Sequence, residues 1–459
     1  MTSHLDLIRS AYPGLVWPAV PPEPGALALA LQFQLGRSQW LAPEVLRAEQ
    51  FRQIAALLKH AYETVPFYRE RLESARFRAG DPVTEAWFTA LPVVTRSQVR
   101  DAREALHSSH VPPAHAPVIV AHTSGSTGTP ITCLHTSITE TFFRAFNLRD
   151  QLWHRRDLGL KLAAIRSDRD VRGEQGMNFS GWGPATTSAY RDGAAALLHS
   201  TNSLERQLEW LSEQDPAYML TLGGNLLELA REMHRRGIRL PQLREAQTYG
   251  DALSPEARAE CRALLGVRVV DIYSSVEAGF IALQCPDHDV YHVQSEGILV
   301  EILDESGRHC PAGAIGRVVL TTLHNFAMPL IRYEIGDYVE AGAPCACGRG
   351  LPVIRRVLGR ERNLAMAPDG RRFYPSFMAG KWVHIAPLRQ MQLVQKTRLA
   401  IEARIVASRP LDPAEERALA AAVQETLGHP YQITIARVER IARSPSGKYE
   451  DFIREPGVC

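Results

Sequence analysis

Hydroxyl side chains and glycines crowd one short stretch of the chain, Ser124, Gly125, Ser126, Thr127, Gly128 and Thr129. Such a loop presents backbone N–H groups and hydroxyls to one small volume, which is how proteins hold phosphate. The Walker A pattern needs a lysine and a following helix. Here the loop has no lysine, and residues 131–136 have the pattern of a strand. The stretch therefore predicts a phosphate-binding loop between two strands, with a polar hairpin turn as the alternative.

Further short motifs follow the loop in chain order. They are YGDALSP at 249–255, YSSVEAG at 273–279, LIRYEIGDYV at 330–339, GRERN at 359–363 and SPSGKYEDF at 444–452. They contribute the carboxylates of Glu277 and Asp337 and the amine of Lys448, which lies in a Ser/Gly loop. An isolated charged residue is usually only solvated. The set in this order is a stronger signal than any single member.

A second constellation consists of sulfur and imidazole ligands. Cys285 and His292 are seven residues apart, and Cys345 and Cys347 flank one residue on a glycine-bordered turn. Thiolates and imidazoles suit a tetrahedral, structural zinc ion, so we predict Zn²⁺ at these four residues. His288 is the alternative histidine, and four thiols and imidazoles without a metal are the alternative to a zinc site.

The elements that must position these groups fall into two predicted domains. From residue 117 onward, short apolar runs alternate with helical segments, which is typical of an α/β domain with a largely parallel sheet. Residues 297–322 are expected to add a smaller β-subdomain. After residue 360 the pattern restarts as a compact α+β module of ordinary domain size. We expect a large N-terminal domain over 1–359 and a small C-terminal domain over 360–459.

Several element boundaries can be predicted from capping residues and periodicity. The apolar residues of 46–65 recur at helical spacing and predict an amphipathic helix. A helix is expected to begin at Ser137, with Glu140 placed for a capping box. Another is expected to begin at Ser254, with Pro255 in its first position.

Together the motifs resemble those of the acyl-adenylate-forming (ANL) superfamily of acyl-CoA synthetases, adenylation domains and luciferases. More closely, they resemble the phenylacetate–CoA ligase branch, over roughly residues 45–455. The resemblance implies a large adenylate-forming domain and a small, mobile C-terminal lid domain. It also implies ATP-dependent activation of a carboxylic acid as an acyl-adenylate, release of pyrophosphate, and transfer to a thiol, expected to be coenzyme A.

The resemblance assigns roles to single residues. Lys448 and Glu277 would be catalytic, with Glu277 binding Mg²⁺ and Lys448 placing a charge between the carboxylate and the α-phosphate. Asp337 would accept hydrogen bonds from both ribose hydroxyls. The other residues expected at the nucleotide are the loop residues Ser124, Gly125, Ser126, Thr127, Gly128 and Thr129, then Gly250, Asp251, Tyr273, Ser274 and Arg360. The family pattern is altered at Val276, which has no hydroxyl, and at Arg362, where an acidic residue is usual.

The acid pocket has the weakest signal. The resemblance places the acyl group near Trp182, Gly183, Gly223 and Tyr249, and an aromatic wall beside glycines suits an aryl or other small organic acid. A core position for Trp182 is the alternative.

Composition limits the partners. The chain of 459 residues has 52 Lys+Arg and 50 Asp+Glu, a net charge of +2, which gives no reason to expect nucleic acid or a membrane surface. The first residues lack a signal-peptide core, and seven cysteines without an export signal favour the reducing cytoplasm. The acceptor could also be an amine or a carrier protein, and a nucleotide-binding regulatory pseudoenzyme is a third possibility.

Overall fold

The protein is described here from a computed structural model. The structure describes residues 8–123, 131–168, 170–171, 173–373, 375, 382, 384–441, 450–455 and 457–458. The predicted phosphate loop, Ser124–Thr129, and the predicted catalytic Lys448 lie outside the described residues.

The helices agree with most of the sequence-based expectations. They are α1 (Glu23–Ser38), α2 (Pro43–Thr64), α3 (Pro66–Ser74), α4 (Glu85–Thr89), α5 (Arg96–Ala102), α6 (Ser137–Trp153), α7 (Pro184–Thr187), α8 (Leu204–Gln214), α9 (Gly223–Arg236), α10 (Pro255–Leu265) and α12 (Pro413–Leu427), with 3-10 turns η2 (Arg103–Leu106), η3 (Pro113–His115) and η4 (Glu361–Asn363). The amphipathic segment at 46–65 is confirmed as most of α2. Among the described residues, no helix has both the length and the apolar character that crossing a membrane requires.

One helix start was predicted with the wrong cap. α6 begins at Ser137 as expected, but Thr136 is its N-cap and Thr139 completes the capping box, not Ser137 with Glu140. Thr139 has a hydroxyl that reaches back to the Thr136 N–H, which the longer Glu140, one residue further along the helix, does not do here. The start of α10 is confirmed, with Ser254 accepting a hydrogen bond from the Ala257 N–H.

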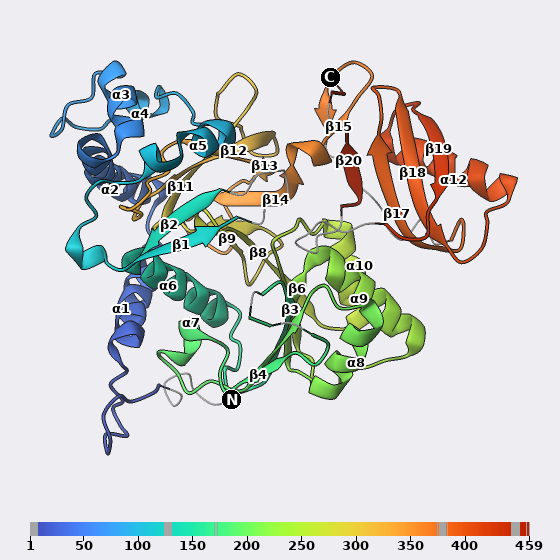
Figure 1. Ribbon diagram of the computed structural model, residues 1–459, viewed down its shortest axis with the longest axis horizontal. Helices are drawn as coiled ribbons and strands as arrows, with labels where there is room; N and C mark the ends of the chain where they lie inside the picture. The colour runs from blue at the N-terminus through green and yellow to red at the C-terminus, as the bar shows by residue number, and fades with distance from the viewer. Residues whose placement is uncertain are drawn as a thin grey trace.

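The large domain is organised on a twelve-stranded sheet with the order β11-β12-β13-β14-β10-β9-β8-β7-β6-β3-β5-β4. Its strands are β3 (Leu162–Arg166), β4 (Met177–Phe179), β5 (Ala195–His199), β6 (Tyr218–Leu222), β7 (Glu245–Tyr249), β8 (Arg268–Ser275), β9 (Gly279–Gln284), β10 (Tyr291–Val293), β11 (Ile298–Leu303), β12 (Ile315–Thr322), β13 (Tyr333–Ala341) and β14 (Val353–Arg360). The strands β5, β3, β6, β7 and β8 are parallel. The α/β prediction is confirmed, and the β-subdomain around 297–322 joins the same sheet through antiparallel strands (Figure 1).

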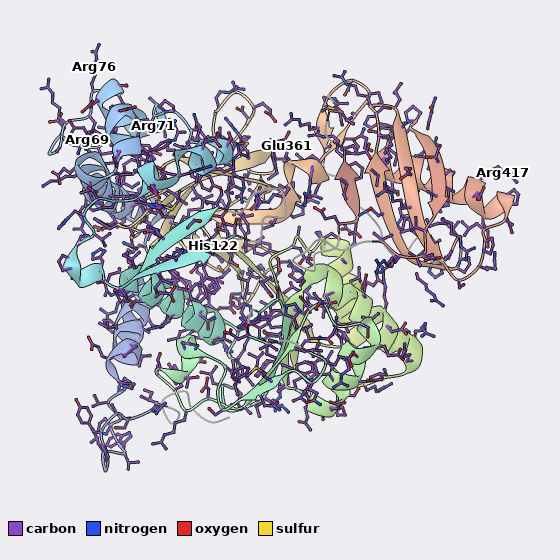
Figure 2. The ribbon with its side chains drawn as sticks, viewed as in Figure 1. Arg69, Arg71, Arg76, His122, Glu361 and Arg417 are labelled. Atoms are coloured by element: carbon purple, nitrogen blue, oxygen red, sulfur yellow. The ribbon has the colours of Figure 1, made fainter. Side chains whose placement is uncertain are left out.

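A separate hairpin carries the predicted phosphate loop. β1 (Val118–His122) pairs with β2 (Thr132–Thr136) in antiparallel register, so the loop joins two strands, as expected. Figure 2 shows His122 at the end of β1, on the approach to the loop.

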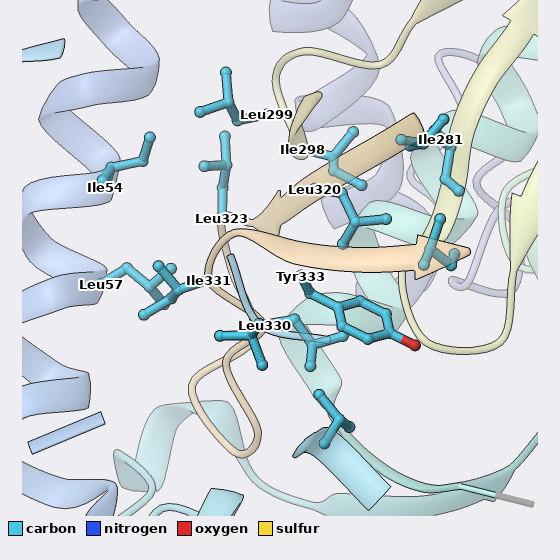
Figure 3. Packing of buried hydrophobic residues seen from close by; sticks show 14 of the residues in the cluster. Ile54, Leu57, Ile281, Ile298, Leu299, Leu320, Leu323, Leu330, Ile331 and Tyr333 are labelled. Atoms are coloured by element: carbon cyan, nitrogen blue, oxygen red, sulfur yellow. The ribbon is translucent and has the colours of Figure 1, made fainter. Parts of the chain in front are cut away.

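Separate apolar clusters pack against the parallel and the antiparallel parts of the sheet. α8, α9 and α10 cover one face of the parallel strands, where Leu226, Met219 and Ala246 are buried. The antiparallel region packs against α2, where Ile54 and Leu57 face Leu323 and Ile331 (Figure 3). Because side chains alternate along a strand, Ile272 and Leu283 point to the other face, where they pack with α6.

The C-terminal part forms the expected α+β module. A four-stranded sheet has the order β19-β18-β17-β20, and α12 packs against it around buried Leu419 and Val423. The strands are β17 (Leu388–Gln395), β18 (Ala400–Ala407), β19 (Gln432–Arg437) and β20 (Phe452–Arg454), with the small hairpin β15 (Ala365–Met366) and β16 (Arg372–Phe373) beside them. Figure 1 shows this module as a separate lobe beside α9 and α10.

Candidate functional site

The predicted ribose-binding carboxylate lies where the sheet bends sharply. Asp337 of β13 and Tyr273 of β8 are separated by three intervening strands, β14, β10 and β9, which would be roughly 19 Å in a flat sheet. Yet the Tyr273 hydroxyl donates a hydrogen bond to Asp337 Oδ2 at 2.9 Å. The strong bend brings residues 64 positions apart in the sequence into direct contact.

Asp337 is held by a cation as well. Arg360 Nε lies 2.9 Å from Asp337 Oδ1, and Arg360 also donates to the Ile335 carbonyl at 2.6 Å. Burial and the adjacent Asp337 carboxylate raise the pKa of Tyr273 well above its usual range, so this phenol stays protonated as a donor. The structure thus brings together Tyr273, Asp337 and Arg360, three of the residues predicted at the nucleotide.

Glu277 sits just past the end of β8 and is only 5% exposed. Its Oε1 pairs with Arg96 Nη1 at 2.6 Å. The same guanidinium donates to the Tyr333 hydroxyl at 3.1 Å and reaches Thr123 Oγ1 at 3.5 Å. Thr123 immediately precedes the predicted phosphate loop, so this network ties Glu277 to the foot of that loop.

Sequence reasoning missed Arg96. It occupies the first position of α5, whose start is fixed by a capping box between Thr95 and Gln98. Those capping residues are the only local sequence feature that marks the position of Arg96. The contact with Glu277 spans 181 positions and could not be inferred from spacing.

The turn after β7 is confirmed as tight, and Asp251 has a structural task in it. Gly250 adopts φ +80°, a left-handed conformation that favours glycine. Asp251 Oδ1 accepts a hydrogen bond from the Gly223 N–H at 2.6 Å, and Oδ2 accepts one from the Gly224 N–H at 3.2 Å. The carboxylate therefore caps the N-terminus of α9, and its predicted place at the nucleotide stays a prediction.

The tryptophan proposed for the acid pocket lies at the other end of the strands. Trp182 donates from Nε1 to the Leu160 carbonyl at 2.8 Å and packs edge-on against Tyr218 at 5.1 Å. Leu160 and Tyr218 are at the amino ends of β3 and β6, whereas open α/β sheets bind ligands at the carboxyl ends. The assignment of Trp182 and its neighbour Gly183 to the pocket stays a prediction that this placement disfavours. Tyr249 and Gly223 lie at the carboxyl ends, as expected.

The four predicted zinc ligands come together from distant parts of the chain. The ligand atoms of Cys285, His292, Cys345 and Cys347 all lie within 4.8 Å of one another. Cys285 Sγ is 3.9 Å from Cys345 Sγ, and Cys347 Sγ is 3.3 Å from His292 Nε2. Burial, with the nearby Arg349, lowers the pKa of His292 to about 4, so the ring is in the neutral form that binds metal. The residues fit a tetrahedral zinc ion, and the group contains His292, not His288.

The segment that carries Cys345 and Cys347 is anchored at the ends of α1 and α6. The guanidinium of Arg349 lies between two tryptophan rings, 4.8 Å from Trp40 and 4.6 Å from Trp153. The Gly350 N–H donates to the Gln39 carbonyl at 2.9 Å. The metal-ligand turn, which joins β13 to β14, therefore contacts the C-terminal ends of α1 and α6.

The segment between the predicted domains is tied to the C-terminal module. Arg362 Nε lies 2.9 Å from Glu450 Oε1, and Asn363 donates to the Phe452 carbonyl at 2.9 Å. Glu450 is two positions after Lys448 in the sequence. Glu361, labelled in Figure 2, marks this junction between the two lobes.

Comparison with known protein families shows to which family the chain belongs. A family model described as AMP-binding enzyme matches residues 51–328. The chain belongs to the AMP-binding enzyme family. A second model, described as CapK C-terminal domain, matches residues 366–455, which is the C-terminal module.

Individual relatives agree with this affiliation. The chain is 24% identical to the phenylacetate-coenzyme A ligase of Pseudomonas putida over 76% of this chain and 78% of that protein. It is 28% identical to the enzyme of the same name from Thermus thermophilus, over 73% and 75%.

Among solved structures, 2-hydroxyisobutyryl-CoA ligase in its postadenylation state has a TM-score of 0.70 at 21% identity, covering 92% of both chains. The open form of that ligase has a TM-score of 0.60. These likenesses establish the ANL fold.

Proposed function

We propose that this protein is an AMP-forming acid–thiol ligase. It activates a carboxylic acid with ATP as an acyl-adenylate, releases pyrophosphate and transfers the acyl group to coenzyme A. Two groups of contacts carry the proposal, in a chain of the AMP-binding enzyme family. Asp337 contacts Tyr273 and Arg360, and Glu277 is linked through Arg96 to Thr123, which precedes the predicted phosphate loop.

The nucleotide would be held through its sugar and its phosphates. Asp337 is the proposed acceptor for both ribose hydroxyls, since its two oxygens are already oriented by Tyr273 and Arg360. The loop Ser124–Thr129 is the proposed cradle for the β- and γ-phosphates. Lys448 is proposed to neutralise charge between the carboxylate and the α-phosphate, where negative charge accumulates in the transition state.

Glu277 is proposed to bind Mg²⁺, which in this site would neutralise the triphosphate. Its Oε1 now pairs with Arg96, and we propose that the metal replaces Arg96 at this carboxylate. Arg96 is then left beside Thr123, next to the loop that would hold the phosphates. We propose that Arg96 changes its partner from Glu277 to a phosphate oxygen, which keeps both charges paired throughout.

Zn²⁺ is proposed as a structural ion at Cys285, His292, Cys345 and Cys347. The buried and half-buried thiols converge without forming disulfides, and four protein ligands leave no open position for catalysis. The ion would fasten the turn after β13 to the strand pair β9–β10.

The two domains are proposed to divide at Gly359–Arg360. The matched family ranges end and begin on either side of this point. Since Lys448 belongs to the C-terminal module and Glu277 to the large domain, adenylation needs the module to close. Transfer to the thiol is proposed to follow a rotation at the linker.

The first experiment is pyrophosphate release from ATP across a panel of small aryl and alkyl acids, with phenylacetate included. Release that depends on one acid supports the proposal, and no release with any acid contradicts it. The same reactions supplied with coenzyme A, a carrier protein or simple amines distinguish the ligase from an amide synthetase. ATP binding without turnover under all conditions would favour a regulatory pseudoenzyme.

A further inference from the structure

Arg349 is a buried cation beside the proposed zinc ligands. Its side chain is 9% exposed, and its ion-pair contact is Asp287, a 60% exposed side chain whose Oδ2 lies 3.5 Å from Arg349 Nη1. Nη1 has no hydrogen-bond partner among the residues that the structure describes. A charged side chain is rarely buried unless it is closely paired. The described carboxylates therefore do not account for the burial of this charge.

Arg349 contacts the group of residues that would hold the metal. Both its backbone N–H and its side chain form hydrogen bonds with the Cys347 thiol. Its charge also acts on the ring of His292. Two of the four proposed zinc ligands are thus within the influence of this one guanidinium.

A zinc ion at these ligands would need a cation close by. Three thiolates and one neutral imidazole around Zn²⁺ have a net negative charge, and a buried net charge is costly unless an opposite charge balances it. Arg149 also acts on His292, but its guanidinium pairs with both carboxylate oxygens of Glu296, at 2.7 and 3.0 Å. Of these two cations, Arg349 is the one that can balance the zinc–thiolate group.

Aromatic rings and an amide fix the orientation of the Arg349 guanidinium. The guanidinium carbon lies 4.8 Å from the centre of the Trp40 ring and 4.6 Å from that of Trp153. Arg349 Nε donates to Gln39 Oε1 at 2.9 Å, and Trp153 Nε1 donates to the same oxygen at 3.0 Å. A planar guanidinium stacks on aromatic faces, whereas the lysine ammonium is a compact, strongly hydrated charge. The position therefore favours arginine over lysine.

We infer that Arg349 is a positioning residue for the proposed zinc ion: its clamped guanidinium balances the charge of the metal–thiolate group and slows the loss of the metal. The inference rests on the proposed zinc site and extends it beyond the four ligands. Removing a group that hydrogen-bonds a metal ligand typically lowers metal affinity by about 10- to 100-fold. Because the same guanidinium contacts Gln39, Trp40 and Trp153, zinc binding and the packing of the ends of α1 and α6 should stabilise each other.

The test measures how fast the full-length, zinc-loaded protein loses the metal to an excess of a chromogenic zinc chelator. Arg349→Gln removes the charge and should release zinc at least about tenfold faster than the wild type. Arg349→Lys keeps the charge but loses the planar stacking, so its rate should lie between the two. The matched control is Arg355→Gln on β14, because the Arg355 side chain is 62% exposed and pairs with Glu340. Its rate should equal that of the wild type.

A second measurement distinguishes an effect on the metal from an effect on packing alone. The melting temperatures of the wild type and of Arg349→Gln are compared with zinc bound and after its removal. Arg349→Gln should lower the melting temperature of the zinc-loaded protein more than that of the zinc-free protein, since the negative charge that Arg349 balances is present only with the metal bound.

The outcomes separate the two proposals. Unchanged zinc release in Arg349→Gln, or an equal loss of melting temperature with and without zinc, would overturn the inference and leave the zinc site in place. A wild-type protein that binds no zinc even when the metal is supplied would instead remove the zinc site itself. Faster release in Arg349→Gln but not in Arg355→Gln, with a larger loss of melting temperature in the zinc-loaded protein, would establish the role of Arg349.

Discussion

Replacing Asp337 with alanine tests the centre of the proposed nucleotide site. The carboxylate is 9% exposed and would accept hydrogen bonds from the two ribose hydroxyls. Hydrogen bonds to a charged group contribute about 1.5–3 kcal/mol. At 1.4 kcal/mol per factor of ten, loss of one such bond in Asp337→Ala should raise the KM for ATP by roughly 10- to 150-fold, and loss of both by more, measured by acid-dependent pyrophosphate release.

The same substitution also disturbs the fold locally. Tyr273 and Arg360 both lose their partner, so the free energy of unfolding should fall by about 1–3 kcal/mol. Tyr273→Phe is the matched control, since it removes the phenol–carboxylate hydrogen bond and leaves the carboxylate in place. It should cost about 0.5–1.5 kcal/mol of stability, measured by urea unfolding, and change the KM for ATP far less.

A change in the nucleotide identifies the ribose contact directly. The wild-type protein should discriminate against 2′-deoxy-ATP. Asp337→Ala should lose most of that discrimination, because the variant has no carboxylate to accept a hydrogen bond from the 2′-hydroxyl of ATP. If Asp337→Ala discriminated between ATP and 2′-deoxy-ATP as strongly as the wild type, Asp337 would not be the ribose ligand.

The other predictions concern the metals and the lid. Freshly purified protein should contain about one zinc per chain by elemental analysis, and the double change Cys345→Ser with Cys347→Ser should remove it and lower the melting temperature; zinc-free wild-type protein would contradict this. Arg96→Gln should lower stability by about 1–3 kcal/mol because it leaves Glu277 buried and unpaired, and adding Glu277→Gln should restore much of that stability in chemical unfolding without restoring activity. Lys448→Ala should lose most pyrophosphate release yet still transfer the acyl group from a prepared acyl-adenylate to coenzyme A, and equal loss in both half-reactions would mean that the lysine is structural.

Short-range features of this protein could be predicted from the sequence because local chemistry determines them. The strands β3, β6 and β8 follow from apolar runs, and the start of α10 follows from Ser254 and Pro255. The ordered motifs also predicted the family. The zinc ligands could be proposed as a set because a soft metal accepts few residue types.

The pairings within the site depended on tertiary structure. Tyr273 reaches Asp337 only because the sheet bends, and Glu277 meets Arg96 across most of the large domain. The placement of Trp182 shows the same dependence: a sequence shows that an aromatic residue lies near a strand, but not at which end of the sheet its ring is packed. Contacts between distant residues are set by strand order and sheet curvature, and neither is contained in the spacing of residues along the chain.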